Sequence, residues 1–160
     1  MTGSSDRDES RPIDASGLTI AVVVSRFNPD ITSGLLEGAK VAFLTAGGNE
    51  ANLPVTGVPG AFEMPQAVRR LAADESLDGI ITLGCLIKGE TLHFEVLAHS
   101  VTQTLSDLST RINMPLAFGL LTALDRDQAL VRSAAGEHNR GAEVMRSLIE
   151  MISSAGSRAA

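Results

Sequence analysis

A short loop followed by a helix combines groups that would bind an anion and move a proton. Residues 89–91 read Gly-Glu-Thr and lie directly before a predicted helix whose first turn contains His93. The first N–H groups of a helix have no partner within it and the helix dipole is positive there, so this junction suits an anion. Histidine can give or take a proton near neutral pH. Two plainer interpretations stay open, in which Thr91 is only an N-cap and His93 an ordinary surface or core residue.

Phe27 and Glu63 follow two other predicted strands. Phe27 lies in SRFNPD, where it either stacks on a flat ring or packs over the sheet edge. Glu63 opens a helix within VPGAFEMP, and the helix dipole by itself favours a carboxylate there. The alternative is that Glu63 accepts hydrogen bonds from ligand hydroxyl groups. Neither GxGxxG nor GxxxxGK[ST] occurs in the chain, so a dinucleotide or nucleotide site of the usual kind is not expected.

Cys85, Phe118 and Arg132 fit ordinary structural roles, whereas Arg140 does not. Cys85 lies within a predicted strand, which is typical of a small buried hydrophobe. Phe118 also falls within a strand and is expected in the core. Arg132 is late in a helix, where a solvated cation is compatible with the dipole. Arg140 places a cation at a helix start, against that preference, which indicates a ligand or a neighbouring subunit.

Alternating strands and helices position these segments. Near-continuous apolar runs predict buried strands at residues 18–25, 53–58, 79–87 and 115–121. Apolar stripes of helical period predict helices from residue 31 to the glycines at 47–48, and at residues 64–71, 93–110, 125–134 and 139–154.

This order predicts an α/β fold, a three-layer sandwich of the flavodoxin-like kind. Its four-stranded parallel sheet would carry helices on both faces. Ligands of such folds bind at the carboxyl ends of the strands. These ends correspond to residues 26–28, 59–63, 87–91 and 122–124, which contain several of the groups described above.

The composition indicates one globular domain. The chain has 160 residues, of which 44% are hydrophobic and 20% charged. A formal net charge of −6 and an aromatic content of 3% argue against a nucleic-acid partner. No apolar run reaches the roughly 20 residues of a membrane span. We expect a polar, mobile tail over residues 1–16, whose inner part from residue 12 could dock, a domain over 17–155 and a disordered end over 156–160.

Cysteine and histidine usage predicts no metal and no disulfide. The single cysteine excludes an intramolecular disulfide framework. His93 and His99 are six residues apart and do not share a helix face as paired metal ligands would. The N-terminus lacks the basic-then-apolar pattern of a secretory signal. We therefore expect a cytoplasmic protein.

Six motifs in order resemble those of the 6,7-dimethyl-8-ribityllumazine synthases of riboflavin biosynthesis. They are SRFN (25–28), GAFEMP (60–65), GxxIKGETxHFE (84–95), FGLLT (118–122), QALxR (128–132) and NRGAE (139–143). The resemblance implies an enzyme, a transferase, that condenses 5-amino-6-(D-ribitylamino)uracil with 3,4-dihydroxy-2-butanone 4-phosphate. Phosphate and water leave as the lumazine forms. The resemblance implies no metal or organic cofactor.

The resemblance also implies a role for each candidate residue in binding the pyrimidine substrate. Phe27 would stack on the pyrimidine ring, and Asn28 is a further candidate beside it. The segment Ala61, Phe62 and Glu63 would hold this substrate and its ribityl chain. The segment Cys85, Leu86 and Ile87 would contact the edge of the pyrimidine through backbone groups.

The remaining candidates would bind the phosphate substrate or come from a second subunit. Glu90 and Thr91 correspond to the phosphate loop, with Glu90 contributing only its backbone, and His93 corresponds to the proton-transfer residue. Phe118 and Arg132 would be supplied by the neighbouring subunit, with Arg132 pairing with the phosphate through its guanidinium group. Arg140 stands where many relatives carry a lysine near the pyrimidine.

The resemblance implies a homo-oligomer with its active site between subunits. Relatives form pentamers, decamers or icosahedral shells of twelve pentamers, and the short connection at residues 133–138 favours the shell. The N-terminal segment could add a strand to a neighbouring subunit, and riboflavin synthase is an expected partner. Two alternatives remain: a flavodoxin-like module that binds a flavin or lumazine without turnover, and a shell-forming homologue that has lost catalysis.

Overall fold

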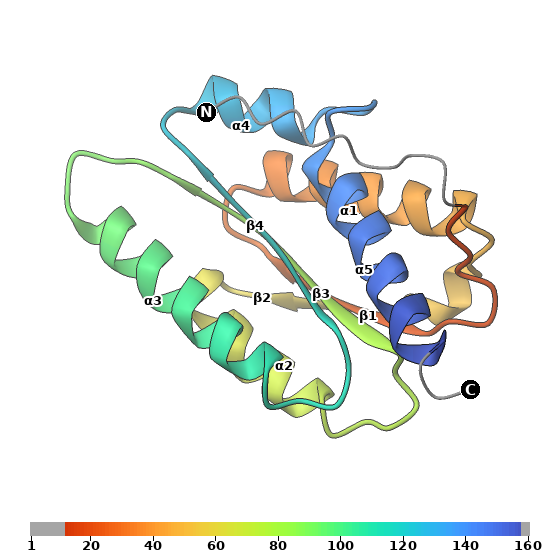
Figure 1. Ribbon diagram of the computed structural model, residues 1–160. Helices are drawn as coiled ribbons and strands as arrows, with labels where there is room; N and C mark the ends of the chain where they lie inside the picture. The colour runs from red at the N-terminus through yellow and green to blue at the C-terminus, as the bar shows by residue number, and fades with distance from the viewer. Residues whose placement is uncertain (1–11, 158–160) are drawn as a thin grey trace.

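The computed structural model describes residues 12–157 as one parallel sheet between two layers of helices (Figure 1). The strands are β1 (Ile20–Ser25), β2 (Val55–Val58), β3 (Gly79–Ile87) and β4 (Leu116–Ala123). The helices are α1 (Pro29–Thr45), α2 (Met64–Leu71), α3 (His93–Ser109), α4 (Arg126–Ser133) and α5 (Arg140–Ser157), with short 3-10 helices η1 (Glu50–Asn52) and η2 (Ala61–Glu63). This confirms the predicted three-layer α/β fold and its order of elements.

The sheet has the strand order β2-β1-β3-β4, and every neighbouring pair is parallel. β3 is central and is buried along nearly its whole length, as its unbroken apolar run predicts. The ladder between β1 and β3 ends at the pair Val24–Leu83, whereas β3 continues beside β4 as far as the pair Ile87–Ala123. The last residues of β3 therefore extend past β1.

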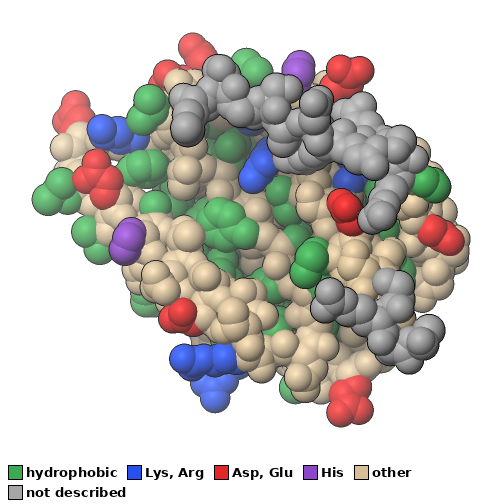
Figure 2. All heavy atoms as spheres, in the orientation of Figure 1, with side chains coloured by type: hydrophobic (Ala, Val, Ile, Leu, Met, Phe, Trp, Pro, Cys, Tyr) green, Lys and Arg blue, Asp and Glu red, His purple; other side chains and the backbone are tan. Residues whose placement is uncertain are grey.

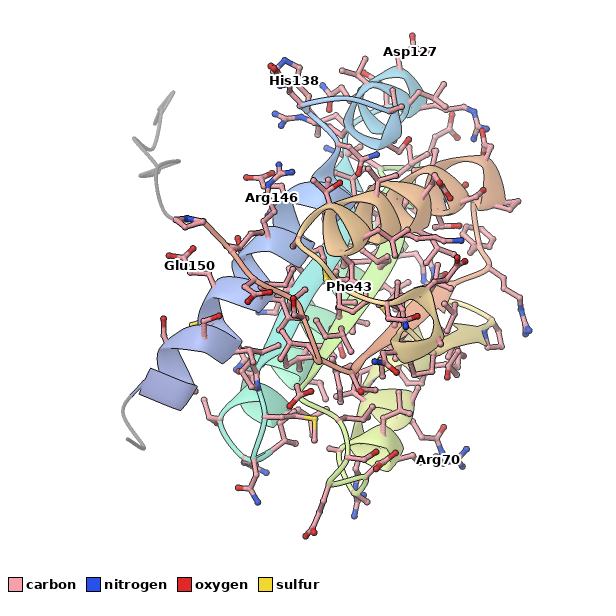
Figure 3. The ribbon with its side chains drawn as sticks, turned by 90° about the vertical axis from the view of Figure 1, so that its right-hand side faces the viewer. Phe43, Arg70, Asp127, His138, Arg146 and Glu150 are labelled. Carbon is pink, nitrogen blue, oxygen red and sulfur yellow. The ribbon has the colours of Figure 1, made fainter. Side chains whose placement is uncertain are left out.

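Two hydrophobic clusters hold the layers together. α1, α4 and α5 cover one face of the sheet, where Phe43 of α1 is fully buried and points into the core (Figure 3). α2 and α3 cover the other face around Met64 and Leu105. Successive residues of β1 alternate between the clusters, with Val22 in the first and Val23 in the second.

The elements differ from the predicted ones mainly at their ends. α1 begins at Pro29, two residues earlier than predicted, because proline at the first helical position has a suitable fixed φ and lacks only an N–H that the helix does not need. β4 continues to Ala123 because its pairing with β3 continues that far. η2 was not predicted, since a single 3-10 turn has no hydrophobic period to reveal it.

The described chain is ordered before the predicted domain start. Ala15 is fully buried in the first cluster, and its N–H donates to the carbonyl of Ala46 at 2.8 Å. The inner part of the polar segment therefore docks on the end of α1. At the other end α5 reaches Ser157. The rest of the predicted tail and terminus, residues 1–11 and 158–160, lies outside the described residues.

The topology brings the segments after β1, β2 and β3 to one edge of the sheet, as parallel strands require. Among residues 12–157, no helix is long and apolar enough to cross a membrane.

Candidate active site

A pocket of about 470 Å³ lies at this edge, between the ends of β1 and β3, η2 and the first two turns of α3. It gathers most of the residues that the sequence predicted for a site. Its lining comprises Phe27, Asn28, Gly60, Ala61, Phe62, Glu63, Cys85, Leu86, Ile87, Gly89, Thr91, His93, Phe94 and Leu97.

A strained turn holds Phe27 out of the core. Asn28 has a φ of 57°, a left-handed conformation that asparagine tolerates better than most residues. Its carbonyl accepts the N–H groups of Ile31 and Thr32 at 3.0 Å, which begins α1, and its Nδ2 donates to the Cys85 carbonyl at 3.2 Å. The Phe27 side chain, 64% exposed, therefore lies at the pocket and not under the sheet edge. This favours the ring-stacking interpretation of Phe27 over the packing one.

The end of β3 presents backbone polar groups to the pocket. Beyond Leu83 this strand no longer pairs with β1, so the residues from Gly84 to Ile87 have one edge free of the β1 ladder. The Asn28 side chain already reaches one of the carbonyls on that side, that of Cys85. A planar ligand with its own donors and acceptors could pair with this edge as a strand would.

The Cys85 thiol is not suited to nucleophilic chemistry. The residue is buried, and burial raises the pKa of its thiol to about 11, with the nearby charge of Asp30 adding to the rise. The thiol is therefore protonated at neutral pH, and the thiolate is the reactive form. This supports the predicted role of Cys85 as a small buried hydrophobe that also lines the pocket.

η2 places an aromatic ring and a carboxylate on the opposite side of the pocket. Phe62 is 68% exposed, and Glu63 is half-buried with its carboxylate folded back over Gly60. Glu63 also occupies the N-cap position of α2, but its side chain makes no capping hydrogen bond there. The carboxylate thus has capacity to accept hydrogen bonds from a ligand.

The loop before α3 forms the polar end of the pocket. Gly89 and Thr91 line it, while Glu90 is exposed and lies outside the lining. The Thr91 hydroxyl accepts the N–H of His93 at 3.4 Å, a long bond, and no side chain caps α3 at Leu92. The helix N-terminus therefore keeps N–H groups for an anion, and His93, which is exposed, stands beside them.

Phe118, Arg132 and Arg140 lie on a different surface of the protein. Arg132 and Arg140 line a hollow of about 800 Å³ beside α4, and Arg140 and Phe118 line a second of about 360 Å³ beside β4. Neither hollow shares a residue with the pocket. Arg140 is compensated at its helix start by an ion pair with Glu143 at 2.8 Å. Phe118 is 37% exposed and not in the core as its strand position suggested, because β4 is an edge strand.

Hydrophobic side chains are visible over β4, between α3 and α5 (Figure 2). Two large ones on this surface, Phe118 and Met151, are exposed. Both side chains of this apolar strip line the hollow beside β4 together with Arg140, which also lines the hollow beside α4.

Three lining residues were not singled out by sequence reasoning. Phe94 and Leu97 belong to the apolar stripe of α3, and besides lining the pocket they pack against the second hydrophobic cluster. Gly60 lies two residues after the end of β2 and has the extended conformation that leads into η2. Their position in the sequence could have indicated them. Apolar residues in the first turns of a helix that follows a strand lie close to the carboxyl ends of the strands, where ligands bind.

The described residues contain no group of three or more His, Cys, Asp or Glu side chains placed to hold a metal ion.

Comparison with known protein families matches residues 17–155 to 6,7-dimethyl-8-ribityllumazine synthase. The chain belongs to the 6,7-dimethyl-8-ribityllumazine synthase family. Membership supports a lumazine synthase function, that of a transferase in riboflavin biosynthesis.

The Asn28 turn generates a stability prediction. Replacing Asn28 with alanine should lower the free energy of unfolding by about 2 kcal/mol, because alanine is strained at positive φ and the bond to Cys85 is lost. Asn28→Gly keeps access to positive φ and should lose only about 1 kcal/mol. Urea denaturation at one fixed protein concentration measures both. Equal losses in the two variants would show that backbone strain at this turn is unimportant.

Proposed function

We propose that the protein condenses 5-amino-6-(D-ribitylamino)uracil with 3,4-dihydroxy-2-butanone 4-phosphate to give 6,7-dimethyl-8-ribityllumazine, phosphate and water. One observation carries the proposal: a single pocket joins an exposed aromatic side chain, a strand edge free of the β1 ladder, an available carboxylate and a helix N-terminus with a histidine, where Thr91 makes one long bond to a backbone N–H. These are the groups that a flat ring, a polyol chain and a phosphate require.

The pyrimidine substrate would lie between Phe27 and the end of β3. A flat ring gains contact area and a favourable offset geometry against an aromatic face. Its amide edge would pair with the backbone groups that β3 leaves beyond the β1 ladder. The ribityl hydroxyl groups would donate to Glu63, whose carboxylate makes no capping hydrogen bond.

The phosphate substrate would lie at the loop before α3. The N–H groups at the start of this helix and the dipole favour a dianion there. Arg132 of a neighbouring subunit would add a bidentate charged contact, because within its own subunit Arg132 lines a separate hollow.

His93 stands beside the phosphate site and would serve the proton transfers. The substrate amine attacks the ketone, and loss of water gives an imine. A proton is then removed from the carbon chain as the C–O bond to phosphate breaks and phosphate leaves with the electron pair. Ring closure by the second amine, with loss of another water, gives the lumazine. His93 can take a proton at the elimination and return one to a leaving oxygen.

Holding two substrates together is the larger catalytic effect. Converting a bimolecular condensation into an intramolecular one contributes at most ~7–11 kcal/mol, whereas a histidine shuttle typically adds ~10²–10⁴-fold in rate. The pocket shape and the anion site thus carry most of the acceleration.

We also propose a pentamer-based assembly in which each site is completed by the next subunit. The edge strand β4, its exposed apolar strip and the two adjoining arginines form the surface that would cover a neighbour's pocket. The short connection between α4 and α5 favours a shell over a free pentamer. Light scattering distinguishes these assemblies by mass.

The direct test supplies both substrates to the purified protein and follows lumazine fluorescence and phosphate release together. We expect equimolar appearance of the two products. Tight binding of the lumazine without turnover would support a binding module, and assembly with neither binding nor turnover would support a shell protein that has lost catalysis.

His93→Ala should reduce kcat by at most ~10²–10⁴-fold and leave activity well above the uncatalysed rate. Substrate positioning is intact in this variant, so the KM values should change little. His99→Ala, an exposed change further along the same helix, is the matched control and should behave as wild type. A His93 variant with normal substrate binding and no activity above background would contradict the order of the two catalytic effects.

Arg132→Ala should raise KM for the phosphate substrate by roughly 10- to 100-fold, the equivalent of one charged hydrogen-bonded contact.

A mixture of two impaired variants tests whether the site is shared between subunits. Mixing unfolded Arg132→Ala and Phe27→Ala subunits and reassembling them should restore part of the activity, because about one quarter of the interfaces would then have both native residues. Steady-state kinetics of the mixture measures the recovery. No recovery in correctly sized mixed assemblies would mean that both residues act within one subunit.

A further inference from the structure

The Asn139 side chain joins three helices. It is 2% exposed, and its Oδ1 accepts the N–H of Ala142 at 3.0 Å, which caps α5. Its Nδ2 lies within hydrogen-bond distance of three carbonyls, those of Gly34 in α1 at 3.0 Å, Ser133 at 2.9 Å and Ala134 at 3.1 Å. An N-cap needs only the acceptor, so the contacts of the amide nitrogen serve another purpose.

Two glycines of α1 leave room for the Asn139 amide and for the end of α4. A Cβ atom at Gly38 would lie 1.9 Å from Asn139 Oδ1, and one at Gly34 would lie 2.4 Å from the Ser133 carbonyl oxygen. Side chains at these two positions would therefore push Asn139 and the end of α4 away from α1. Two glycines one helical turn apart let the helices approach closely enough for the amide to reach all its partners.

Arg132 and Arg140 lie next in sequence to the residues that the Asn139 side chain connects. Ser133 and Ala134 directly follow Arg132, and Arg140 directly follows Asn139. Both arginines line the same hollow. The residues between them, 134–138, are exposed, and His138 points away from the helices (Figure 3). This exposed connection contributes little packing, whereas the buried Asn139 amide directly contacts the carbonyls of Ser133 and Ala134 at its other end.

We propose that Asn139 is a positioning residue for phosphate recognition. Its amide fixes the C-terminal end of α4 against α1 and α5, and so fixes where Arg132 stands when the neighbouring subunit presents its helix N-terminus. The proposal rests on the proposed function, in which Arg132 binds the phosphate substrate across the interface. Misplacement of a charged contact by about 1 Å is enough to cost up to ~10²-fold.

Asn139→Ser tests the amide separately from the cap. Serine keeps an acceptor for the Ala142 N–H but has one hydroxyl, which is too short to reach the three carbonyls. We expect KM for the phosphate substrate and the inhibition constant of inorganic phosphate to rise together, on the order of 10-fold. KM for the pyrimidine substrate and kcat at saturation should stay near the wild-type values. A purely structural role would instead lower the active fraction with both KM values unchanged.

A double-mutant cycle with Arg132→Ala decides whether Asn139 acts through that arginine. If it does, the double variant should have the same KM for the phosphate substrate as Arg132→Ala alone, since there is no guanidinium left to misplace. Multiplying effects would overturn the proposal. If Arg132→Ala itself leaves this KM unchanged, the proposed function of Arg132 fails and the positioning role with it. An effect of Arg132→Ala without one of Asn139→Ser overturns the positioning role alone.

If the Asn139→Ser variant does not fold, Gly38→Ala tests the same proposal. The added methyl group displaces the amide while Asn139 itself remains, so the same selective rise in KM is expected. Gly156→Ala is the matched control, because a Cβ at that position meets nothing within 4 Å. Wild-type kinetics of a folded Gly38→Ala variant, in place of that rise, would overturn the proposal.

Discussion

The site depends on the different lengths of two neighbouring strands. β3 continues four residues beyond the last pair of the β1 ladder, and the chain after β1 must turn sharply to begin α1. Asn28 occupies that turn and bridges the gap to the Cys85 carbonyl. Asn28 thus serves two elements at once: its carbonyl begins α1, and its side chain contacts the end of β3 beyond the β1 ladder. Phe27 lies at the pocket directly before this turn, around which the proposed pyrimidine site is built.

In the proposed function, the rest of the site comes from a different surface of the chain, presented by a neighbouring subunit. The helix N-terminus of α3 faces the pocket with a positive dipole, while the guanidinium of Arg132 lies beside α4. If these two positive groups bind one dianion, as we propose, they would repel each other in an empty site built on a single chain. In the proposed assembly the two groups lie on different subunits, so this repulsion is absent before assembly and tight phosphate binding would require assembly.

Most of the fold could be predicted because the apolar pattern repeats with the period of each element. The strand Gly79–Ile87 and the helix Met64–Leu71 have the bounds that the sequence indicated. The site was less predictable. Phe27 had two interpretations, of which its exposure at the pocket favours ring stacking, and Phe94 and Leu97 were not among the candidates. Asn139 entered the sequence analysis only as part of the motif NRGAE, and the contacts of its amide with α1 and α4 were not predicted.

The sequence by itself determined the elements, their order and the strand ends at which ligands could bind, because hydrophobic period and turn residues act over a few neighbouring positions. It also determined which residue types stand at those ends. Only the tertiary structure decided that Phe118 lies at an open edge, and that Arg132 lies apart from the pocket that contains His93. These facts depend on the strand order β2-β1-β3-β4 and on the packing of α4 against α1, contacts between residues far apart in the chain that no local pattern encodes.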